Sequence, residues 1–226
     1  MKVEIKIEDW VRELLLEIKE NVKGYDIFLG GGYLRDIYCK LDYKDLDIFL
    51  VPSGEKKGIS PYKPKGYFEL YTKDCEESDD MQVRGVAGLI GFRRKTLSNQ
   101  DLTIPNMLNY KTTIQDTTEL QYIIYEDGVI ADIEELAEDM DMTLNQVMWE
   151  PSSESDVCIC TEEFLKAHRG GWIEFAHEYD ELRMYSRQKL MQDKFPSYLC
   201  LDDIILDSDQ IAMLHDKGEH EYEGSA

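Results

Sequence analysis

Residues 28–36 read FLGGGYLRD, and this stretch begins the part of the sequence that decides the fold. The glycines follow a short apolar strand predicted over 25–29 and precede a helix predicted over 33–41. Glycine permits positive φ and close backbone approach, and the first N–H groups of the next helix face such a turn. We therefore predict a phosphate cradle at Gly31 and Gly32, with Arg35 adding a bidentate contact. An ordinary tight turn is the alternative.

Residues 44–49, KDLDIF, supply the second part of the pattern. In a strand, positions i and i+2 point to the same side, so Asp45 and Asp47 project together while Leu46 and Ile48 enter the core. Two neighbouring carboxylates repel each other unless a cation lies between them. Magnesium held by carboxylates and substrate phosphates is the usual solution. We therefore predict a metal site at Asp45 and Asp47. The alternative is a solvent-exposed pair on an edge strand.

The spacing of these residues resembles a known signature. Gly31-Gly32-x-x-Arg35-Asp36, followed nine positions later by Asp45-x-Asp47, is similar to the head-domain motif of tRNA nucleotidyltransferases (CCA-adding enzymes) and poly(A) polymerases. These enzymes belong to the DNA polymerase β-like superfamily.

Two further segments are similar to the same family. IEEL at 133–136, leading to DMTLNQV at 141–147, resembles its D-F-T-I-N segment. Asp180 and Arg183 resemble its base-reading E-D-x-x-R helix, with Tyr179 where Glu is expected. The interval 52–132 is long for the family, so the resemblance points to a small, divergent member of the phage-encoded type.

The expected fold is α+β, a mixed-sheet polymerase β-like head over 1–150 with a short helical neck over 157–206. The polar, acidic segment 207–226 is predicted to be a disordered tail. Hydrophobic patterns predict strands over 45–51, 67–71, 86–92, 107–112 and 119–126, and helices over 9–22, 133–139, 162–168 and 172–195.

The resemblance implies transfer of NMP from an NTP, ATP or CTP, to an acceptor hydroxyl, with release of pyrophosphate. An RNA or tRNA 3′ end is the favoured acceptor. Asp45 and Asp47 would hold two Mg²⁺ ions, and Asp36 would orient Arg35 or a sugar contact. The family also implies a third carboxylate. Glu119 stands in the right order, with Asp101 and Asp132 as alternatives, and a strand-entry surface glutamate is an equal interpretation of Glu119.

Charge and cysteine content limit the partners. The net charge of -22 argues against a broad nucleic-acid surface, although basic residues cluster at 84–95 and 183–194. Nucleotidylation of a protein or small molecule, and non-catalytic nucleotide or partner binding, therefore stay open as alternatives. The 5 cysteines are scattered and odd in number, which predicts free thiols. No apolar run reaches membrane-spanning length, so we expect a cytoplasmic protein with no membrane and no DNA partner.

Overall fold

The computed structural model describes residues 1–53, 62–74, 85–94, 119–152, 154–177, 181–204 and 206. The main sheet has 8 strands in the order β1-β8-β7-β2-β3-β6-β5-β4, and a second sheet pairs β10 with β9. The strands of the main sheet are β1 (Lys2–Glu4), β2 (Tyr25–Gly30), β3 (Asp45–Pro52), β4 (Tyr67–Asp74), β5 (Val86–Arg94), β6 (Glu119–Tyr125), β7 (Val147–Trp149) and β8 (Val157–Cys160). The small sheet consists of β9 (Trp172–Ile173) and β10 (Leu199–Cys200).

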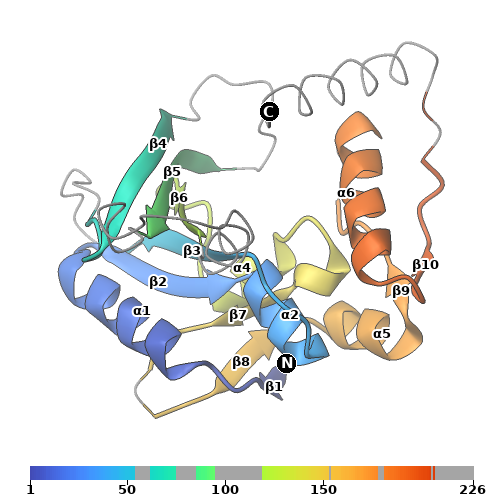
Figure 1. Cartoon of the computed structure of the whole chain (residues 1–226), viewed down its shortest axis with the longest axis horizontal. Coiled ribbons are helices and arrows are strands. Elements are labelled where there is room, and N and C mark those ends of the chain that lie inside the picture. Colours follow the sequence, from blue (N-terminus) through green and yellow to red (C-terminus); the bar gives the residue numbers. More distant parts are fainter. Residues whose placement is uncertain are drawn as a thin grey trace, which may run out of the picture.

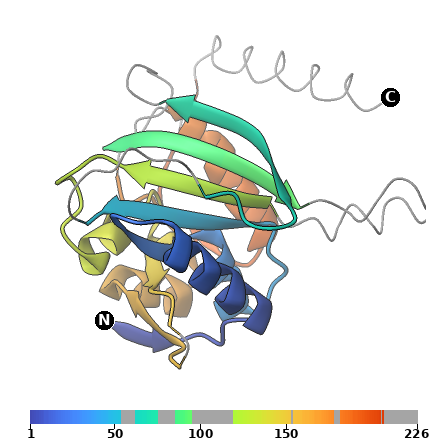
Figure 2. The same ribbon diagram turned by 90° about the vertical axis from the view of Figure 1, so that its left-hand side faces the viewer.

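The sheet is mixed because one neighbouring pair of strands, β3 and β6, runs parallel while β2 runs antiparallel to both β3 and β7. The helices are α1 (Asp9–Asn21), α2 (Gly32–Cys39), α4 (Ile133–Glu138), α5 (Glu162–Gly170) and α6 (Glu181–Lys194), with a short 3-10 turn, η1 (Thr143–Asn145). Figures 1 and 2 show α6 standing beside the sheet. The predicted α+β fold with a mixed sheet is confirmed.

Alternating side chains divide the core between the two faces of the sheet. Leu46, Ile48 and Leu50 pack on the face that α1 and α2 cover, whereas Phe49 and Val51 pack with α4 on the other face. Within the described ranges, no helix is long and apolar enough to span a lipid bilayer.

Helix α1 shows the predicted amphipathic pattern, with its buried residues at Val11, Leu14, Leu15 and Ile18. The N-cap is Glu8, and Asp9, where the predicted helix also begins, is the first helical residue. Helix α2 ends at Cys39, two residues before the predicted end, because Lys40 adopts the left-handed conformation with φ 58°.

The helix predicted over 172–195 is wrong in its first part. Gly171 ends α5 with φ 68°, and Trp172–Ile173 then forms a strand parallel to β10, whereas α6 begins at Glu181. The strands predicted at 67–71, 86–92 and 119–126 appear as β4, β5 and β6. The strand predicted at 107–112 and the tail at 207–226 lie outside the described residues.

The chain after residue 150 contributes to both sheets. β8, at the start of the predicted neck, pairs with β1 and β7 in the main sheet. The two-part division of the chain stays a prediction.

Candidate active site

The glycine turn joins the end of β2 to the start of α2. Gly31 is the N-cap of α2 with φ 65° and ψ -130°, a conformation that side-chain-bearing residues rarely adopt. Gly30 is the last residue of β2 and pairs with Met148 of β7, and a Cβ there would stand 2.2 Å from the Sδ of Met148. The backbone conformation at Gly31 therefore favours glycine, a side chain at Gly30 would displace Met148, and the turn opens directly into the N-terminus of a helix.

The two aspartates face this turn from the adjacent strand. Asp47 is opposite Gly30 in the antiparallel β2–β3 register. A Cβ placed on Gly31 would lie 3.3 Å from the Oδ2 of Asp47, and one placed on Gly32 would lie 4.0 Å from the Oδ1 of Asp45. Both carboxylates thus lie against the glycine turn, as the strand alternation predicts.

The charge of the aspartate pair is poorly compensated. Burial and then the neighbouring Asp45 charge raise the pKa of Asp47, Arg187 and Arg35 lower it, and the net result is a pKa of about 7. Two partly buried oxygen-donor carboxylates on the same side of one strand are suited to a hard divalent cation. Asp45 and Asp47 therefore fit Mg²⁺, which usually keeps water and substrate phosphate as its other ligands.

Glu119, Asp101 and Asp132 are the three predicted candidates for a third carboxylate. The parallel register of β3 and β6 places Glu119 directly beside Asp45. Asp132 is the exposed N-cap of α4, where its Oδ1 accepts a hydrogen bond from the backbone N of Glu135 at 2.9 Å. Asp101 lies outside the described residues. No three acids, histidines or cysteines form a metal-binding group in the part of the chain that the structure describes.

Arg35 has different partners from the phosphate that the sequence predicts. Its guanidinium is buried, and its Nε donates to the Oδ1 of Asp36 at 2.8 Å. Its Nη1 donates to the Oδ1 of Asn145 at 2.7 Å, and the group lies over the Phe195 ring. Asp36 forms ion pairs with both Arg35 and Lys194 of α6. A bidentate phosphate contact would require Arg35 to release one of these partners.

Sequence reasoning missed the residues that continue this network toward α6. The Nδ2 of Asn145 donates to the Oδ1 of Asp141 at 3.0 Å, and the Nε of Arg187 donates to the Oδ2 of Asp141 at 2.9 Å. Burial lowers the pKa of Arg187, whereas the charges of Asp141, Asp47 and Asp45 raise it. The net effect is a raised pKa. Arg187 is therefore the α6 cation near the aspartate pair.

The signals for these residues were present but incomplete. Asp141 and Asn145 both lie in the matched D-F-T-I-N-like segment, and Arg187 follows Arg183 by one helical turn on α6. Arg183 is partly exposed, whereas Asp180 lies outside the described residues. Nothing in the sequence alone selects Arg187 over Arg183.

Solved structures of CCA-adding enzymes share this mixed-sheet α+β fold. An apo form has a TM-score of 0.50 at 11% identity, over 100% of this chain and 48% of that one. The complex with ATP has a TM-score of 0.52 at 11% identity and covers 89% of this chain and 43% of that one. The complex with CTP has a TM-score of 0.51 at 12% identity and covers 88% of this chain and 42% of that one. The chain spans less than half the length of each of these enzymes. No family model and no curated protein matches it.

Proposed function

We propose that this protein is a metal-dependent nucleotidyltransferase that moves NMP from an NTP to an acceptor hydroxyl. The observation that carries the proposal is the contact between the glycine turn and the aspartate pair. A glycine turn suited to phosphate and a carboxylate pair suited to a cation are neighbours, because a Cβ added to Gly31 would lie 3.3 Å from the Oδ2 of Asp47. A metal-bound triphosphate requires both features at one place.

The chain's own groups have distinct roles in this reaction. The backbone of Gly31 and Gly32 and the N-terminus of α2 hold the triphosphate. Asp45 and Asp47 would hold Mg²⁺, and the metal would supply charge neutralisation for the reacting phosphate. Glu119, beside Asp45 in the register, is the group that accepts the proton of the attacking hydroxyl. The hydroxyl oxygen bonds to the α-phosphorus, the bond to the bridging oxygen breaks, and pyrophosphate leaves.

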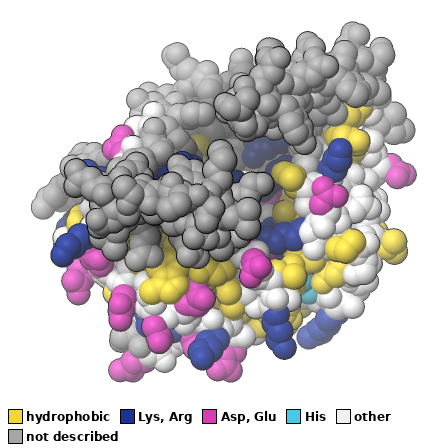
Figure 3. Space-filling model, in the orientation of Figure 1, with side chains coloured by type: hydrophobic (Ala, Val, Ile, Leu, Met, Phe, Trp, Pro, Cys, Tyr) yellow, Lys and Arg dark blue, Asp and Glu magenta, His cyan; other side chains and the backbone are white. Residues whose placement is uncertain are grey.

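The substrates are proposed from the fold and from charge. The structural neighbours include complexes with ATP and with CTP, so one of these is the proposed donor. An RNA 3′ end, as in tRNA, is the proposed acceptor. Helix α6 supports this choice because it brings the Arg187 cation near the aspartate pair, and Figure 3 shows blue Lys and Arg side chains in the middle of this face. Asp180 and Arg183 are the proposed base-reading residues.

A label-transfer assay tests the proposal. The protein is incubated with each α-labelled NTP, Mg²⁺ and total RNA, and label in RNA, protein and small molecules is measured separately. Asp45→Asn and Asp47→Asn should abolish transfer. Asp132→Asn is the matched control, because asparagine caps a helix as well as aspartate does and the residue caps α4.

Three outcomes would contradict the proposal or part of it. Transfer that survives in both aspartate variants removes the assigned metal site. Magnesium-independent NTP binding without transfer to any acceptor makes the chain a non-catalytic nucleotide binder. Label in protein or small molecules but not in RNA keeps the reaction and replaces the acceptor.

A further inference from the structure

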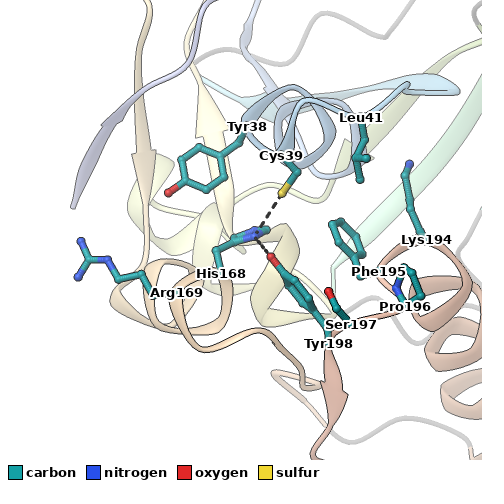
Figure 4. A pocket seen from close by; sticks show the side chains of 10 residues that line it. All are labelled: Tyr38, Cys39, Leu41, His168, Arg169, Lys194, Phe195, Pro196, Ser197 and Tyr198. Atoms are coloured by element: carbon teal, nitrogen blue, oxygen red, sulfur yellow. Dashed lines mark hydrogen bonds between the residues drawn. The ribbon is translucent and has the colours of Figure 1, made fainter.

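A cavity lies at the opposite end of α2 from the glycine turn. Its volume is about 430 Å³, and its walls come from the C-terminal ends of α2, α5 and α6 with the segment that follows α6. Figure 4 shows His168 at its centre, with Cys39 on one side and Tyr198 on the other. Pockets for small ligands begin at about 300 Å³, so the cavity is large enough to hold one planar group.

The floor of this cavity is a neutral hydrogen-bonding edge. The Nε2 of His168 lies 3.4 Å from the carbonyl oxygen of Leu144, which sets Nδ1 as the acceptor. The Sγ of Cys39 and the hydroxyl of Tyr198 share that acceptor, at 3.4 and 3.5 Å. The Tyr198 contact is long for an O–H donor, so a ligand with a donor group can replace it. Burial lowers the pKa of His168 to about 4, so the ring stays neutral at physiological pH.

Aromatic rings form the walls. The Phe195 and Tyr198 rings lie 5.0 Å apart between centroids, and Tyr38 meets His168 edge-on at 5.1 Å. Phe195 is buried, whereas Tyr38 and Tyr198 are partly exposed. An exposed ring over a neutral polar floor is the arrangement that stacks a nucleobase.

Charge at the rim favours a nucleic-acid strand. The lining residues include Arg169 and Lys194 but no carboxylate, in a chain with 47 acids against 25 Lys and Arg. Lys194 is engaged with Asp36, whereas Arg169 is exposed and makes no ion pair within the described ranges. In Figure 4 the Arg169 side chain points away from His168, so a phosphate held by it would lie at the rim while the base enters the cavity.

We infer that this cavity, the Tyr198 pocket, binds an unpaired base of the acceptor RNA strand upstream of the reacting 3′ end. The inference rests on the proposed function for the identity of the strand. The geometry supports it because α2 carries the glycine turn at its N-terminus and contributes to the cavity at its C-terminus. At 1.5 Å per residue this short helix separates the two by roughly 10 Å, a short stretch of nucleic-acid strand.

The test measures RNA affinity without NTP or Mg²⁺, so that binding is separated from catalysis. A fluorescently labelled, unpaired oligoadenylate or oligocytidylate is titrated with the full chain, and anisotropy is recorded at several salt concentrations. Tyr198→Leu keeps apolar volume but removes the ring, and it should weaken binding about five- to a hundredfold, the usual effect of losing one stacked base. Tyr198→Phe keeps the ring and should bind like the unaltered protein.

Arg169→Gln tests the rim. It should reduce the slope of log affinity against log salt by about 0.7, the value for one phosphate contact to a single strand. Lys166→Gln is the matched control, because this substitution also removes one positive charge from α5. Lys166 pairs with Glu162 and is not part of the cavity lining. Circular dichroism of every variant checks folding.

The possible results separate the two proposals. Equal RNA affinity for Tyr198→Leu and Tyr198→Phe in folded proteins overturns the pocket assignment, whatever the transfer assay gives. A free mononucleotide that binds as tightly as the oligonucleotide, with the same loss in Tyr198→Leu, assigns the cavity to a small ligand and also overturns it. Loss of affinity in Tyr198→Leu without any NMP transfer by the unaltered protein supports the RNA pocket and refutes the proposed reaction.

Discussion

Replacing Asp36 should destabilise the protein more than removing any exposed ion pair does. Its side chain is 2% exposed and accepts from Arg35 at 2.8 Å, while Lys194 pairs with its other oxygen. In Asp36→Ala the Arg35 guanidinium, 5% exposed, would retain only the neutral acceptors Asn145 and Met191. A buried charge left without its partner costs about 3–5 kcal/mol.

Equilibrium urea unfolding followed by tryptophan fluorescence measures this effect. A loss of about 3–5 kcal/mol corresponds to a fall in Tm of about 6–20 °C for a chain of this size. Glu150→Ala is the matched control, because Glu150 pairs with Lys19 at 2.9 Å with side chains 63% and 41% exposed. Surface pairs of this kind contribute about 0–1 kcal/mol.

A double variant separates charge burial from simple packing loss. Arg35→Met combined with Asp36→Leu removes both buried charges and keeps apolar volume, so it should be more stable than Asp36→Ala alone. The reasoning is refuted if Asp36→Ala is as mild as Glu150→Ala. A double variant no more stable than Asp36→Ala would equally refute it.

Three further predictions concern single positions. Gly31→Ala should cost about 1–3 kcal/mol in unfolding free energy because φ is 65°, and it should weaken NTP binding in calorimetry because its Cβ would approach Asp47. Gly30→Ala should cost about 1–3 kcal/mol through overlap with buried Met148, measured by urea unfolding. His168 has its pKa lowered from 6.5 to about 4 by burial, so the unfolded chain takes up the proton first as pH falls. As pH falls from 6.5 to about 4, the unfolding free energy should therefore decrease. The decrease should exceed that of His168→Gln by at most about 3 kcal/mol, measured by urea titrations across this pH range.

The parts of the site that the sequence predicts are those set by local geometry. Strand alternation places Asp45 and Asp47 together, and the conformation of Gly31 follows from a turn between a strand and a helix. Both depend on neighbours within a few residues. The two features meet because β2 and β3 pair, and the predicted order of strand, turn, helix and strand already implies that pairing.

The parts that local sequence patterns do not determine depend on distant partners. Arg35 bonds to Asn145, 110 positions away, and Asp36 to Lys194, 158 positions away, so no local pattern distinguishes a phosphate ligand from a buried structural arginine. Trp172 fits a helical spacing, but the left-handed Gly171 and the pairing with β10 turn that segment into a strand. Tertiary pairing decides both cases.

Helix α2 makes the network and the site one mechanical unit. Gly32 begins it at the glycine turn, Asp36 joins it to α6 through Lys194, and Cys39 ends it at the Tyr198 pocket. A short helix fixed at its middle by a buried ion pair cannot tilt at one end without moving the other. Asp36→Ala should therefore weaken NTP binding at the turn and RNA binding in the pocket together, although Asp36 contacts neither ligand. Weakening of only one of the two, in protein shown to be folded, would mean that α2 does not couple them.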